Sequence, residues 1–496
     1  MTDMLKLICD KTNDFIRQMP KEMRKKYGQF FTSLETARFM ASLFSIPTKK
    51  NNFLILDAGA GSGILSIALL ERMAIETSYD LHLTCYENDN NIYPLLLSNL
   101  ELAQKQIGSR FSFEIRRDNY ILSQADAFNG GLFVNGKTDQ YDLIIGNPPY
   151  MKISKNTPEG QAMPQVCFGT PNMYFLFAAM GIFNLKDDAE MVYIIPRSWT
   201  SGSYFKNFRK FLFDSSVLTH IHLFDSRNKV FEQESVLQET MIVKICKTKQ
   251  KPERVRITTS ATNHDFDYCT TLDVPYSVVI SGQNQYVFLV TNKEEVLLLA
   301  SMNKMHNTLL DLGFRMKTGL IVDFRSRELL RNEEEENAVP LIYSQHIKEG
   351  YVRFPSGKEN EYLVTDKRSL IQENKNYLFV KRFTAKEEPR RLQCGIYLKR
   401  HLSNFKYIST QNKVNFIDCI HDISECVIYG LYVLFNSTMY DLYYRILNGS
   451  TQVNSTEMNA IPVPSLSIIE KMGKDLIRNK DLSENHCNKI ISSYLA

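Results

Sequence analysis

The residues best suited to chemistry in this chain are the four at positions 147–150, which read Asn-Pro-Pro-Tyr. The side-chain oxygen of Asn147 and the backbone carbonyl of Pro148 can both accept hydrogen bonds from one exocyclic amine. Pro148 and Pro149 have a fixed φ and no N–H, so the loop is stiff and that carbonyl can point outward. The ring of Tyr150 can lie on the face of a planar base. Two acceptors on an amine favour a tetrahedral, more nucleophilic nitrogen, so the loop suits attack by an aromatic amine on an electrophile.

Four residues alone are not decisive, because Asn-Pro is also a common turn and a bare match fits a structural loop equally well. The elements before the loop add the needed information. Residues 141–146 form an apolar run that predicts a strand delivering Asn147 at its carboxyl end. Further upstream, residues 52–57 predict a strand, residues 58–63 a glycine turn and residues 64–72 a helix.

The glycine turn narrows the choice of ligand. Residues 59–63 read G-x-G-x-G, whereas the dinucleotide-binding fingerprint is G-x-G-x-x-G. Glycines let the backbone turn tightly and approach a ligand closely. The shorter spacing therefore argues against a bound pyrophosphate and for a smaller nucleoside.

Acidic residues follow two later predicted strands. Glu87 follows the run at residues 80–86, where a carboxylate can hydrogen-bond ribose hydroxyls, although taken alone it is more simply a solvated loop carboxylate. Asp126 and Ala127 come after the run at residues 112–116 and could bind the amino group and ring of an adenine. The order is glycine turn, ribose acid, adenine loop and amine clamp, each expected at a strand's carboxyl end. In an open α/β sheet, ligands bind at that edge.

These motifs, in this order, resemble those of the gamma-class, TaqI-like or Eco57I-like, DNA adenine-N6 methyltransferases of type II restriction-modification systems, which use S-adenosylmethionine. The family's opening motif matches residues 26–32, its cofactor loop residues 57–63 and its catalytic loop residues 147–150. The resemblance covers roughly the first half of the chain well. It implies an α/β, Rossmann-like class I methyltransferase domain followed by a mixed α+β DNA target recognition domain. Ser33 stands where the family often has proline.

The resemblance also implies a role for each matching residue. The segment around Thr32 would close over the methionine end of the cofactor. The residues that would contact the cofactor are Thr32, Asp57, Gly59, Gly61, Glu87, Asp126, Ala127, Asn147 and Phe177. The catalytic residues would be Asn147, Pro148, Pro149, Tyr150 and Phe231. Phe231 would stack on the extruded adenine opposite Tyr150, with Phe224 as the alternative, and no metal is required.

The composition limits which classes of fold and cellular environment are consistent with the chain. The 496 residues are enough for two or more sizeable cores, and a net charge of +4 implies no overall basic field. Nine cysteines without a C-x-x-C pair favour a reducing cytosol over a disulfide framework or a zinc ribbon. The longest apolar run, residues 173–183, is too short to span a bilayer.

A polar, proline-containing stretch at residues 247–254 predicts a domain boundary. We therefore expect a catalytic domain over residues 1–246, a connecting region over residues 247–305 and a target recognition domain over residues 306–496. The second half combines aromatic-rich extended runs with a helical stretch at residues 427–444, which indicates a mixed α+β domain.

Basic segments of the second half are candidates for DNA contact. Residues 315–325 place basic side chains around a Thr-Gly turn, and residues 375–400 hold eight basic and two acidic side chains. Within the latter, Lys381, Arg382 and the arginines at 390–391 could track phosphates. A charge run is usually a solvated loop, but the enclosed aromatics favour a functional interpretation.

A polar segment at residues 448–456 is a further candidate. Its Gln452 and Asn454 side chains are suited to reading adenine edges, and equally suited to loop turns. The segment resembles a stretch near the end of target recognition domains in the family, so we expect Gln452 and Asn454 to contact DNA.

The expected function is transfer of a methyl group from S-adenosylmethionine to N6 of a flipped-out adenine in duplex DNA, as the modification enzyme of a restriction-modification system. The expected partners are double-stranded DNA and a cognate restriction endonuclease on a separate chain, in the cytoplasm of a bacterium or archaeon and without a membrane. Methyltransferases of the same fold that act on RNA or on a protein glutamine amide are the alternatives, and the latter lack a long C-terminal half. A non-catalytic DNA-binding module and a fused restriction-methylation enzyme are less consistent with the motifs.

Overall fold

The chain forms two compact units. A computed structural model describes residues 3–18, 20, 22, 32–47, 50–130, 139–224, 240–385, 388–448 and 451–495. The first unit comprises Met1–Ile280 and Asn284–Tyr286, and the second comprises Ser281–Gln283 and Val287–Ala496. The Asn-Pro-Pro-Tyr loop belongs to the first unit, and the segments expected to contact DNA belong to the second.

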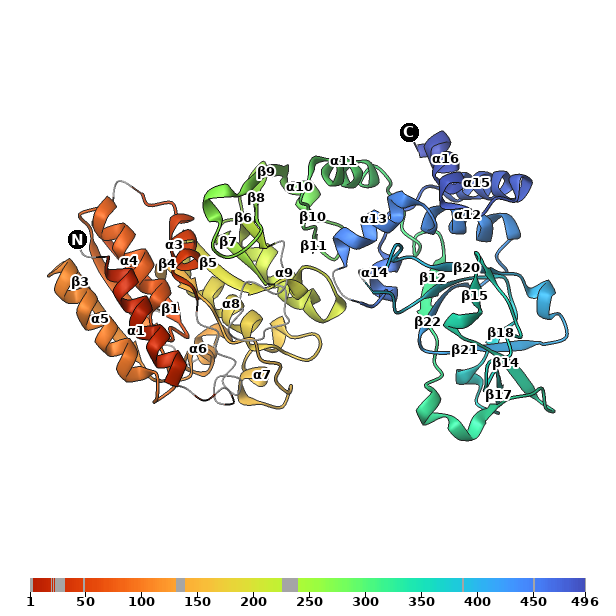
Figure 1. Ribbon diagram of the computed structural model, residues 1–496, viewed down its shortest axis with the longest axis horizontal. Helices are drawn as coiled ribbons and strands as arrows, with labels where there is room; N and C mark the ends of the chain where they lie inside the picture. Colours follow the sequence, from red (N-terminus) through yellow and green to blue (C-terminus); the bar gives the residue numbers. More distant parts are fainter. Residues whose placement is uncertain are drawn as a thin grey trace. The chain divides into compact units, whose positions relative to one another are not determined.

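A nine-stranded mixed sheet forms the centre of the first unit (Figure 1). Its strands are β1 (Asn52–Ala58), β2 (Asp80–Tyr86), β3 (Phe111–Arg116), β4 (Tyr141–Gly146), β5 (Leu185–Pro196), β6 (Val217–Phe224), β7 (Thr240–Cys246), β8 (Arg254–Ser260) and β9 (Thr270–Pro275). They lie in the order β3-β2-β1-β4-β5-β7-β6-β8-β9. The strands from β3 to β5 run parallel, whereas β7 is antiparallel to both β5 and β6.

The direction in which strands are added reverses between β1 and β4. From β1 the chain adds β2 and β3 on one side, and from β4 it adds β5 on the other. The loops after two such strands diverge and leave a crevice that binds ligands in open α/β sheets. The glycine turn follows β1 and the Asn147 loop follows β4, so both motifs leave the sheet at this switch point.

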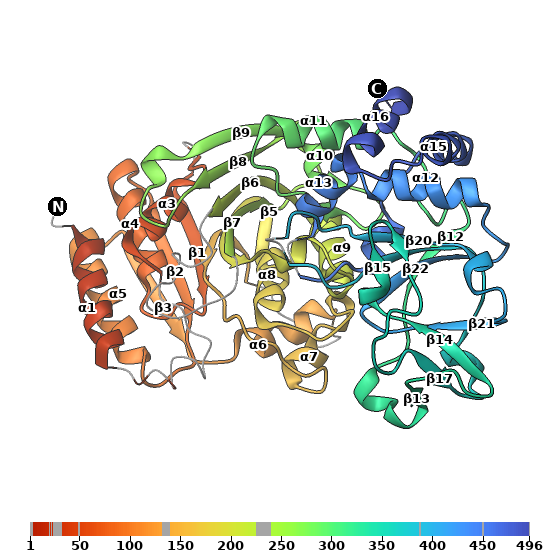
Figure 2. The same ribbon diagram turned by 45° about the vertical axis from the view of Figure 1, so that its right-hand side comes forward.

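Helices cover both faces of the sheet (Figure 2). One layer contains α1 (Met4–Gln18), α3 (Leu34–Ser42), α4 (Ile64–Glu76) and α5 (Tyr93–Ile107). The other contains α6 (Tyr120–Phe128), α8 (Met173–Asn184) and α9 (Lys206–Ser215), with the short α7 (Pro158–Ala162) against α6. The first unit is therefore an α/β, Rossmann-like fold, which confirms the fold class predicted for it.

The most apolar helix of this unit, α8, is a core helix. Asn172 caps its first turn by accepting a hydrogen bond from Tyr174 N at 3.3 Å. Every residue of α8 except Phe183 is buried. Within the described part of the chain, no helix combines the length and the apolar character needed to cross a bilayer.

The first unit extends beyond the boundary expected after residue 246. The polar stretch that suggested the boundary is a turn, because β8 follows it and pairs in parallel with β6, and β9 pairs antiparallel with β8. Helix α10 (Tyr276–Val279) and a hairpin of β10 (Ile280–Ser281) and β11 (Tyr286–Val287) lie where the chain passes from one unit to the other. A turn between strands and a linker both need solvated residues, so composition does not distinguish them.

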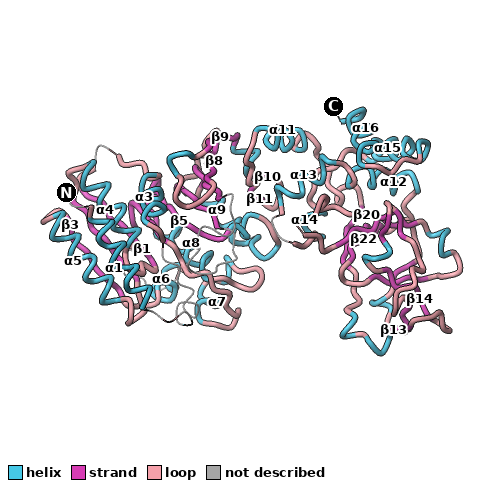
Figure 3. Tube along the Cα trace, viewed as in Figure 1, coloured by secondary structure: helices cyan, strands magenta, loops and turns pink. Residues whose placement is uncertain are grey.

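The second unit is mixed α+β, as predicted, and contains two further sheets, whose strands are magenta in Figure 3. The six-stranded sheet has the order β12-β22-β19-β20-β16-β15, and the five-stranded sheet has the order β13-β17-β14-β21-β18. Their strands are β12 (Phe314–Thr318), β13 (Leu330–Arg331), β14 (Ala338–Ile342), β15 (Ile347–Lys348), β16 (Tyr351–Val352), β17 (Tyr362–Val364), β18 (Gln372–Glu373), β19 (Tyr377–Lys381), β20 (Cys394–Tyr397), β21 (Tyr407–Thr410) and β22 (Val414–Cys419).

The helices of the second unit are α11 (Lys293–Met302), α12 (Glu425–Phe435), α13 (Thr438–Leu447), α14 (Ser455–Asn459), α15 (Leu466–Asn479) and α16 (Glu484–Leu495). The stretch at residues 427–444 that was expected to be one helical segment is therefore divided between α12 and α13. The division occurs at Ser437, whose hydroxyl caps α13 by accepting from Tyr440 N at 3.3 Å. Serine is more favourable at this capping position than in a helix interior, so a new helix starts here.

Two histidines of β6 lie in the sheet of the first unit as neutral rings. His222 is fully buried, and its ring nitrogens lie 2.8 Å from Thr258 Oγ1 and 3.1 Å from Ser260 Oγ, both on β8. Its ring packs against Phe39 of α3 with 4.6 Å between centroids. Burial lowers the pKa of His222 to about 3 and that of His220 to about 4.

Mild acid is expected to destabilise the first unit through His222. Because burial lowers its pKa from 6.5 to about 3, the unfolded chain binds a proton in this pH range that the folded chain does not bind. The free energy of unfolding therefore falls as the pH falls below 6.5, by up to about 1.4 kcal/mol per pH unit for this group. Urea unfolding followed by the fluorescence of Trp199, the one tryptophan of the chain, measures this slope in the first unit.

We expect His222→Gln to flatten the slope, because a neutral amide can keep the two hydroxyl partners without titrating. The same substitution at His82, which is only half-buried on β2, is the matched control. An unchanged slope in His222→Gln would contradict the prediction.

Candidate active site

The glycine turn after β1 is held against the end of β2. Gly59, Gly61 and Gly63 have φ values of 74°, 57° and 79°, which L side chains rarely adopt. The N–H of Gly59 donates to Tyr86 O at 2.8 Å. A side chain at Gly59 would lie 3.5 Å from Phe177, whereas none of the described atoms lies within 4 Å of the corresponding position at Gly61. The turn therefore leaves room for a ligand beside Gly61.

Two buried carboxylates flank this turn. Glu87 accepts from Gly61 N through Oε2 and from Asp89 N through Oε1, each at 2.9 Å. Asp57 is 1% exposed and accepts from Ser66 Oγ at 2.5 Å through Oδ2, while its Oδ1 is buried with no hydrogen-bond partner among the described residues. Burial raises the pKa of Asp57 to about 7 and also raises the pKa of Glu87. A donor or a cation beside Asp57 would stabilise its ionised form.

The expected adenine-binding pair lies on a helix. Asp126 and Ala127 belong to the last turn of α6, and Asp126 is exposed. Asn119 caps α6 by accepting from Leu122 N at 3.2 Å, so the helix begins soon after β3 and carries this pair roughly 9 Å along its axis from that edge. Asp118 instead lies between β3 and α6, at the carboxyl edge of the sheet. Asp118 is the first acidic residue after the predicted strand at residues 112–116, which is the sequence signal that could have found it.

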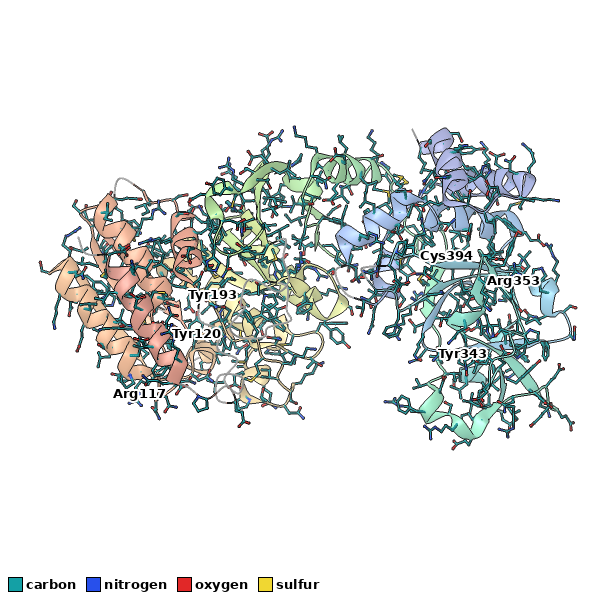
Figure 4. All side chains as sticks on the ribbon, viewed as in Figure 1. Arg117, Tyr120, Tyr193, Tyr343, Arg353 and Cys394 are labelled. Carbon is teal, nitrogen blue, oxygen red and sulfur yellow. The ribbon has the colours of Figure 1, made fainter. Side chains whose placement is uncertain are left out.

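Aromatic rings from three elements extend from the glycine turn. The ring centroids of Tyr86 and Tyr120 lie 4.9 Å apart, and those of Tyr120 and Phe177 lie 5.4 Å apart. Phe177, expected near the cofactor ring, lies against Gly59. Tyr120, which is labelled in Figure 4 and was not predicted as a site residue, donates through its hydroxyl to Asn184 Oδ1 at 2.8 Å. Because this hydrogen bond fixes its hydroxyl, the Tyr120 ring supports the Phe177 ring from the side of α6.

The Asn-Pro-Pro-Tyr loop leaves β4 beside the glycine turn. Pro149 Cδ lies 4.0 Å from the position that a side chain at Gly59 would take. The Asn147 amide is oriented by two hydroxyl groups: its Nδ2 donates to Thr32 Oγ1 at 3.2 Å, and its Oδ1 accepts from the Tyr150 hydroxyl at 2.7 Å. The structure therefore brings together three of the predicted residues, Thr32, Asn147 and Tyr150, at the switch point.

The Tyr150 hydroxyl has two acceptors and one proton. Besides Asn147 Oδ1, it lies 2.9 Å from Ile194 O on β5. Burial raises the pKa of Tyr150 well above its ordinary value, so the group remains a donor. An amide oxygen has two lone pairs, so Asn147 Oδ1 can accept a hydrogen bond from an amine as well as from the Tyr150 hydroxyl.

Thr32 reaches the loop from the start of α3. It is buried, and residues 26–31 of the same predicted motif lie outside the described residues. Ser33, at the position where proline is frequent in the resembling family, caps α3 by accepting from Thr36 N at 3.2 Å. Ser33 therefore has a structural role at this position, because a serine side chain at the N-cap stabilises the start of a helix.

A buried arginine holds the loop that follows β5. Arg209 of α9 is fully buried and donates at 2.8 to 3.1 Å to four main-chain oxygens, those of Trp199, Ser201, Gly202 and Asn284. The same loop contacts the candidate site through Tyr174. The Tyr174 hydroxyl lies 3.0 Å from Ser198 Oγ in the loop, and the ring centroids of Tyr174 and Tyr150 lie 6.4 Å apart. Nothing in the sequence marked Arg209, since a charged residue on a helix is usually solvated.

The second predicted aromatic, Phe231, lies outside the described residues and stays a prediction. Its alternative, Phe224, is the last residue of β6 and is 5% exposed. The Phe224 ring packs against His222 with 4.7 Å between centroids. Phe224 therefore belongs to the core of the first unit.

In the second unit, the structure joins two of the segments expected to contact DNA. Phe383 and Gln452 form an isolated antiparallel bridge, and Val453 N donates to Arg382 O at 2.7 Å. The side chains also meet, since Arg382 Nη2 donates to Gln452 Oε1 at 3.3 Å. Lys381 donates to the neutral Gln393 Oε1 at 2.9 Å, and it is half-buried.

Asn454 and the arginines at 390–391 have structural partners. Asn454 N donates to the Tyr444 hydroxyl at 2.8 Å at the start of α14. Arg391 is 1% exposed and donates through Nε to Thr384 Oγ1 at 3.2 Å, and Arg390 pairs with Glu484 at 2.7 Å. The expectation that the arginines at 390–391 track phosphates is therefore wrong for Arg391, because a buried guanidinium cannot reach a phosphate.

Comparison with known sequences gives consistent matches. The profile of the Eco57I restriction-modification methylase family matches residues 64–231. The chain is 32% identical to the type II methyltransferase M.PstI of Providencia stuartii, over 95% of this chain and 93% of that protein. It is 34% identical to the type II methyltransferase M.BsuBI of Bacillus subtilis, over 97% of this chain and 95% of that protein.

Among solved structures, the chain is similar to the Type IIL restriction-modification enzyme MmeI in complex with DNA. The TM-score is 0.52 at 12% sequence identity, and the match covers 99% of this chain and 73% of that one. At this identity the likeness concerns the fold alone.

Replacement of Arg209 is expected to destabilise the first unit. Arg209→Lys keeps the charge but cannot reach four carbonyl oxygens, so we expect a loss of about 2–4 kcal/mol in the free energy of unfolding. Urea unfolding followed by Trp199 fluorescence measures this loss. Lys210→Ala, at the next and exposed position, is the control and should change stability by less than about 0.5 kcal/mol. Equal losses of stability in Arg209→Lys and Lys210→Ala would contradict the structural role that we give to Arg209.

Proposed function

Because the chain belongs to the type II methyltransferases of restriction-modification systems, and is thus a DNA methyltransferase, we propose that it methylates the exocyclic N6 of adenine in duplex DNA with S-adenosylmethionine as the methyl donor. One observation carries the proposal. The oriented amide of Asn147 and the glycine turn leave the sheet side by side, at the switch point between β1 and β4.

The residues around the glycine turn fit S-adenosylmethionine. Its ammonium and sulfonium groups are cationic, and the buried Asp57 Oδ1 has no hydrogen-bond partner among the described residues. Glu87 is fixed by two main-chain N–H groups and would hold the ribose hydroxyls. Phe177 would pack on the adenine ring, and Asp118 or Asp126 would accept from its amino group. When bound, this cofactor supplies an electrophilic methyl group on a positively charged sulfur.

The residues of the loop would prepare the amine of the target. Asn147 Oδ1 and Pro148 O would accept its two hydrogens, which increases the electron density on nitrogen. The ring of Tyr150 would lie on one face of the adenine, and Phe231 on the other. An adenine within duplex DNA cannot reach such a pocket, so the base would be rotated out of the helix, which costs a few kcal/mol of stacking and pairing. Much of the rate would then come from orientation in the pocket.

The second unit would recognise the DNA sequence. Its joined segments around Arg382 and Gln452 carry polar and basic groups that are suited to base edges and phosphates. Lys381 would contact a phosphate and Asn454 a base edge. A cognate restriction endonuclease would be a separate chain that cleaves the same sequence when it is unmethylated.

The first experiment is nucleoside mass spectrometry on unmethylated DNA incubated with the protein and S-adenosylmethionine. We expect N6-methyladenine with the intact protein. We expect Asn147→Ala to lower the single-turnover rate about 100-fold or more, because it removes one of the two amine acceptors. Binding of the cofactor, measured by calorimetry, should change little.

Tyr150→Phe is the matched variant of the same loop. It keeps the ring and removes the hydroxyl that orients Asn147, so a smaller loss, on the order of 10-fold, is expected. Near-normal turnover by Asn147→Ala would disprove the clamp. Absence of any methylated base, from a protein that still binds S-adenosylmethionine, would favour RNA or a protein glutamine amide as the substrate.

Lys381→Ala is expected to weaken DNA binding to all sequences alike. A lysine that contacts one phosphate contributes about one released counterion, so the slope of log affinity against log salt should become shallower by about 1. Fluorescence anisotropy with a labelled duplex at several salt concentrations measures this slope. An unchanged slope would remove Lys381 from the interface.

A further inference from the structure

Four loops of the second unit are joined by main-chain hydrogen bonds into one edge, which we call the four-loop edge: residues 318–325, 381–384, 410–414 and 451–454. Ile321 N donates to Thr410 O at 3.2 Å, and Arg382 N donates to Lys413 O at 2.9 Å. Arg382 O in turn accepts from Val453 N at 2.7 Å. The loops come from distant parts of the chain, so no local sequence pattern predicts the edge.

The four-loop edge has the composition of an interaction surface for nucleic acid. It carries four basic side chains, Arg325, Lys381, Arg382 and Lys413, and one acidic side chain, Asp323. Large apolar side chains are exposed on it, with Leu320 62%, Phe324 67% and Phe383 44% exposed. Exposed apolar groups among basic ones indicate contact with a partner that is both anionic and able to stack, as DNA is.

Arg382 is held in one orientation at the centre of this edge. Its Nη1 donates to Asn412 O at 3.0 Å and its Nη2 donates to Gln452 Oε1 at 3.3 Å. Its guanidinium lies 5.4 Å from the ring centroid of Phe383. Among the described residues, no carboxylate pairs with Arg382, so its positive charge is not neutralised. The planar group is therefore fixed and still able to bind acceptors.

The loop that carries Gln452 is held by buried residues beneath it. Asn415 is fully buried and donates through Nδ2 to Val453 O at 2.7 Å. The Tyr444 hydroxyl accepts from Asn454 N at 2.8 Å and lies 3.0 Å from Glu457 Oε2, which is also buried. Gln452 is therefore presented on a rigid base, with its side-chain oxygen toward Arg382.

We propose that Arg382 reads a guanine of the recognition sequence and that Gln452 is a positioning residue that holds the Arg382 guanidinium. This inference rests on the proposed function. In the major groove, guanine presents two acceptors, N7 and O6, which match the parallel N–H groups of a fixed guanidinium, whereas adenine presents one acceptor and one donor. Reading of adenine by Gln452 needs the oxygen of its amide as the acceptor, and that oxygen faces Arg382.

The test maps methylated sites. Unmethylated genomic DNA is treated with the full chain and S-adenosylmethionine, and N6-methyladenine is located by single-molecule sequencing. With Arg382→Ala, we expect discrimination at one G·C position of the site to fall about 10- to 100-fold while the other positions keep their preference. Arg382→Lys keeps the charge but not the planar fork, so it should lose the preference at the same position.

Gln452→Leu is the test of the positioning role. It should lower discrimination at the same G·C position by less than Arg382→Ala, and the double variant should be no worse than Arg382→Ala alone. Arg353→Ala is the control. Arg353, which is labelled in Figure 4, follows β16, a strand that lies two positions from β19 in the sheet order, and it pairs with Glu349. It should leave every position unchanged.

A uniform loss of rate with unchanged site preference in both Arg382 variants would overturn the inference, since it would indicate a phosphate contact. Loss of preference at an A·T position would also overturn it. If the wild-type chain methylates no adenine in DNA, the proposed function fails and the inference fails with it. These outcomes are distinguishable, because the first two require a wild type that methylates a defined sequence.

Discussion

The carboxyl ends of β1 and β4 are the constraint on which the candidate site depends. These two strands are parallel neighbours, and the chain leaves them in opposite directions, so their following loops diverge while starting side by side. The glycine turn and the Asn-Pro-Pro-Tyr loop are therefore adjacent although about ninety residues separate them. Three further site residues are brought to this edge by neighbouring elements: Thr32 by the start of α3, Phe177 by α8 and Glu87 by the end of β2.

Around that edge, hydrogen bonds fix polar groups in a buried setting. Asn147 is oriented by Thr32 on one side and by Tyr150 on the other, and the loop after β5 is held by Arg209. Buried polar groups without partners are costly, so each of these bonds specifies one arrangement rather than adding much net stability. A site assembled in this way needs little rearrangement before an amine reaches it. Asp57 Oδ1 is one of the buried polar atoms without a hydrogen-bond partner among the described residues, and its place beside the glycine turn is consistent with a ligand group that completes it.

In the second unit, burial separates arginines that look alike in the sequence. Arg382 and Arg391 lie nine positions apart in one basic stretch, yet Arg391 is 1% exposed beneath Tyr444 whereas Arg382 lies on an edge built from four loops. Arg391 donates to Thr384 and packs on the Tyr444 ring, whereas Arg382 is available to a partner. Burial likewise excludes Phe224 as the second stacking aromatic, because it packs in the core of the first unit. Residue type and charge therefore suggest candidates, and exposure selects among them.

The sequence by itself determined the fold class, the strands from residue 52 to residue 146, the glycine turn and the stiff Asn-Pro-Pro-Tyr loop. These features are local, since glycine spacing, apolar runs and proline stiffness act within a few residues of one another. Only the tertiary structure decided that residues 254–275 complete the first sheet, and that Arg209 and Arg391 are buried. It also joined Arg382 to Gln452, seventy positions away. Such facts depend on strand order and on packing between distant segments, and a linear pattern of residue types does not contain either.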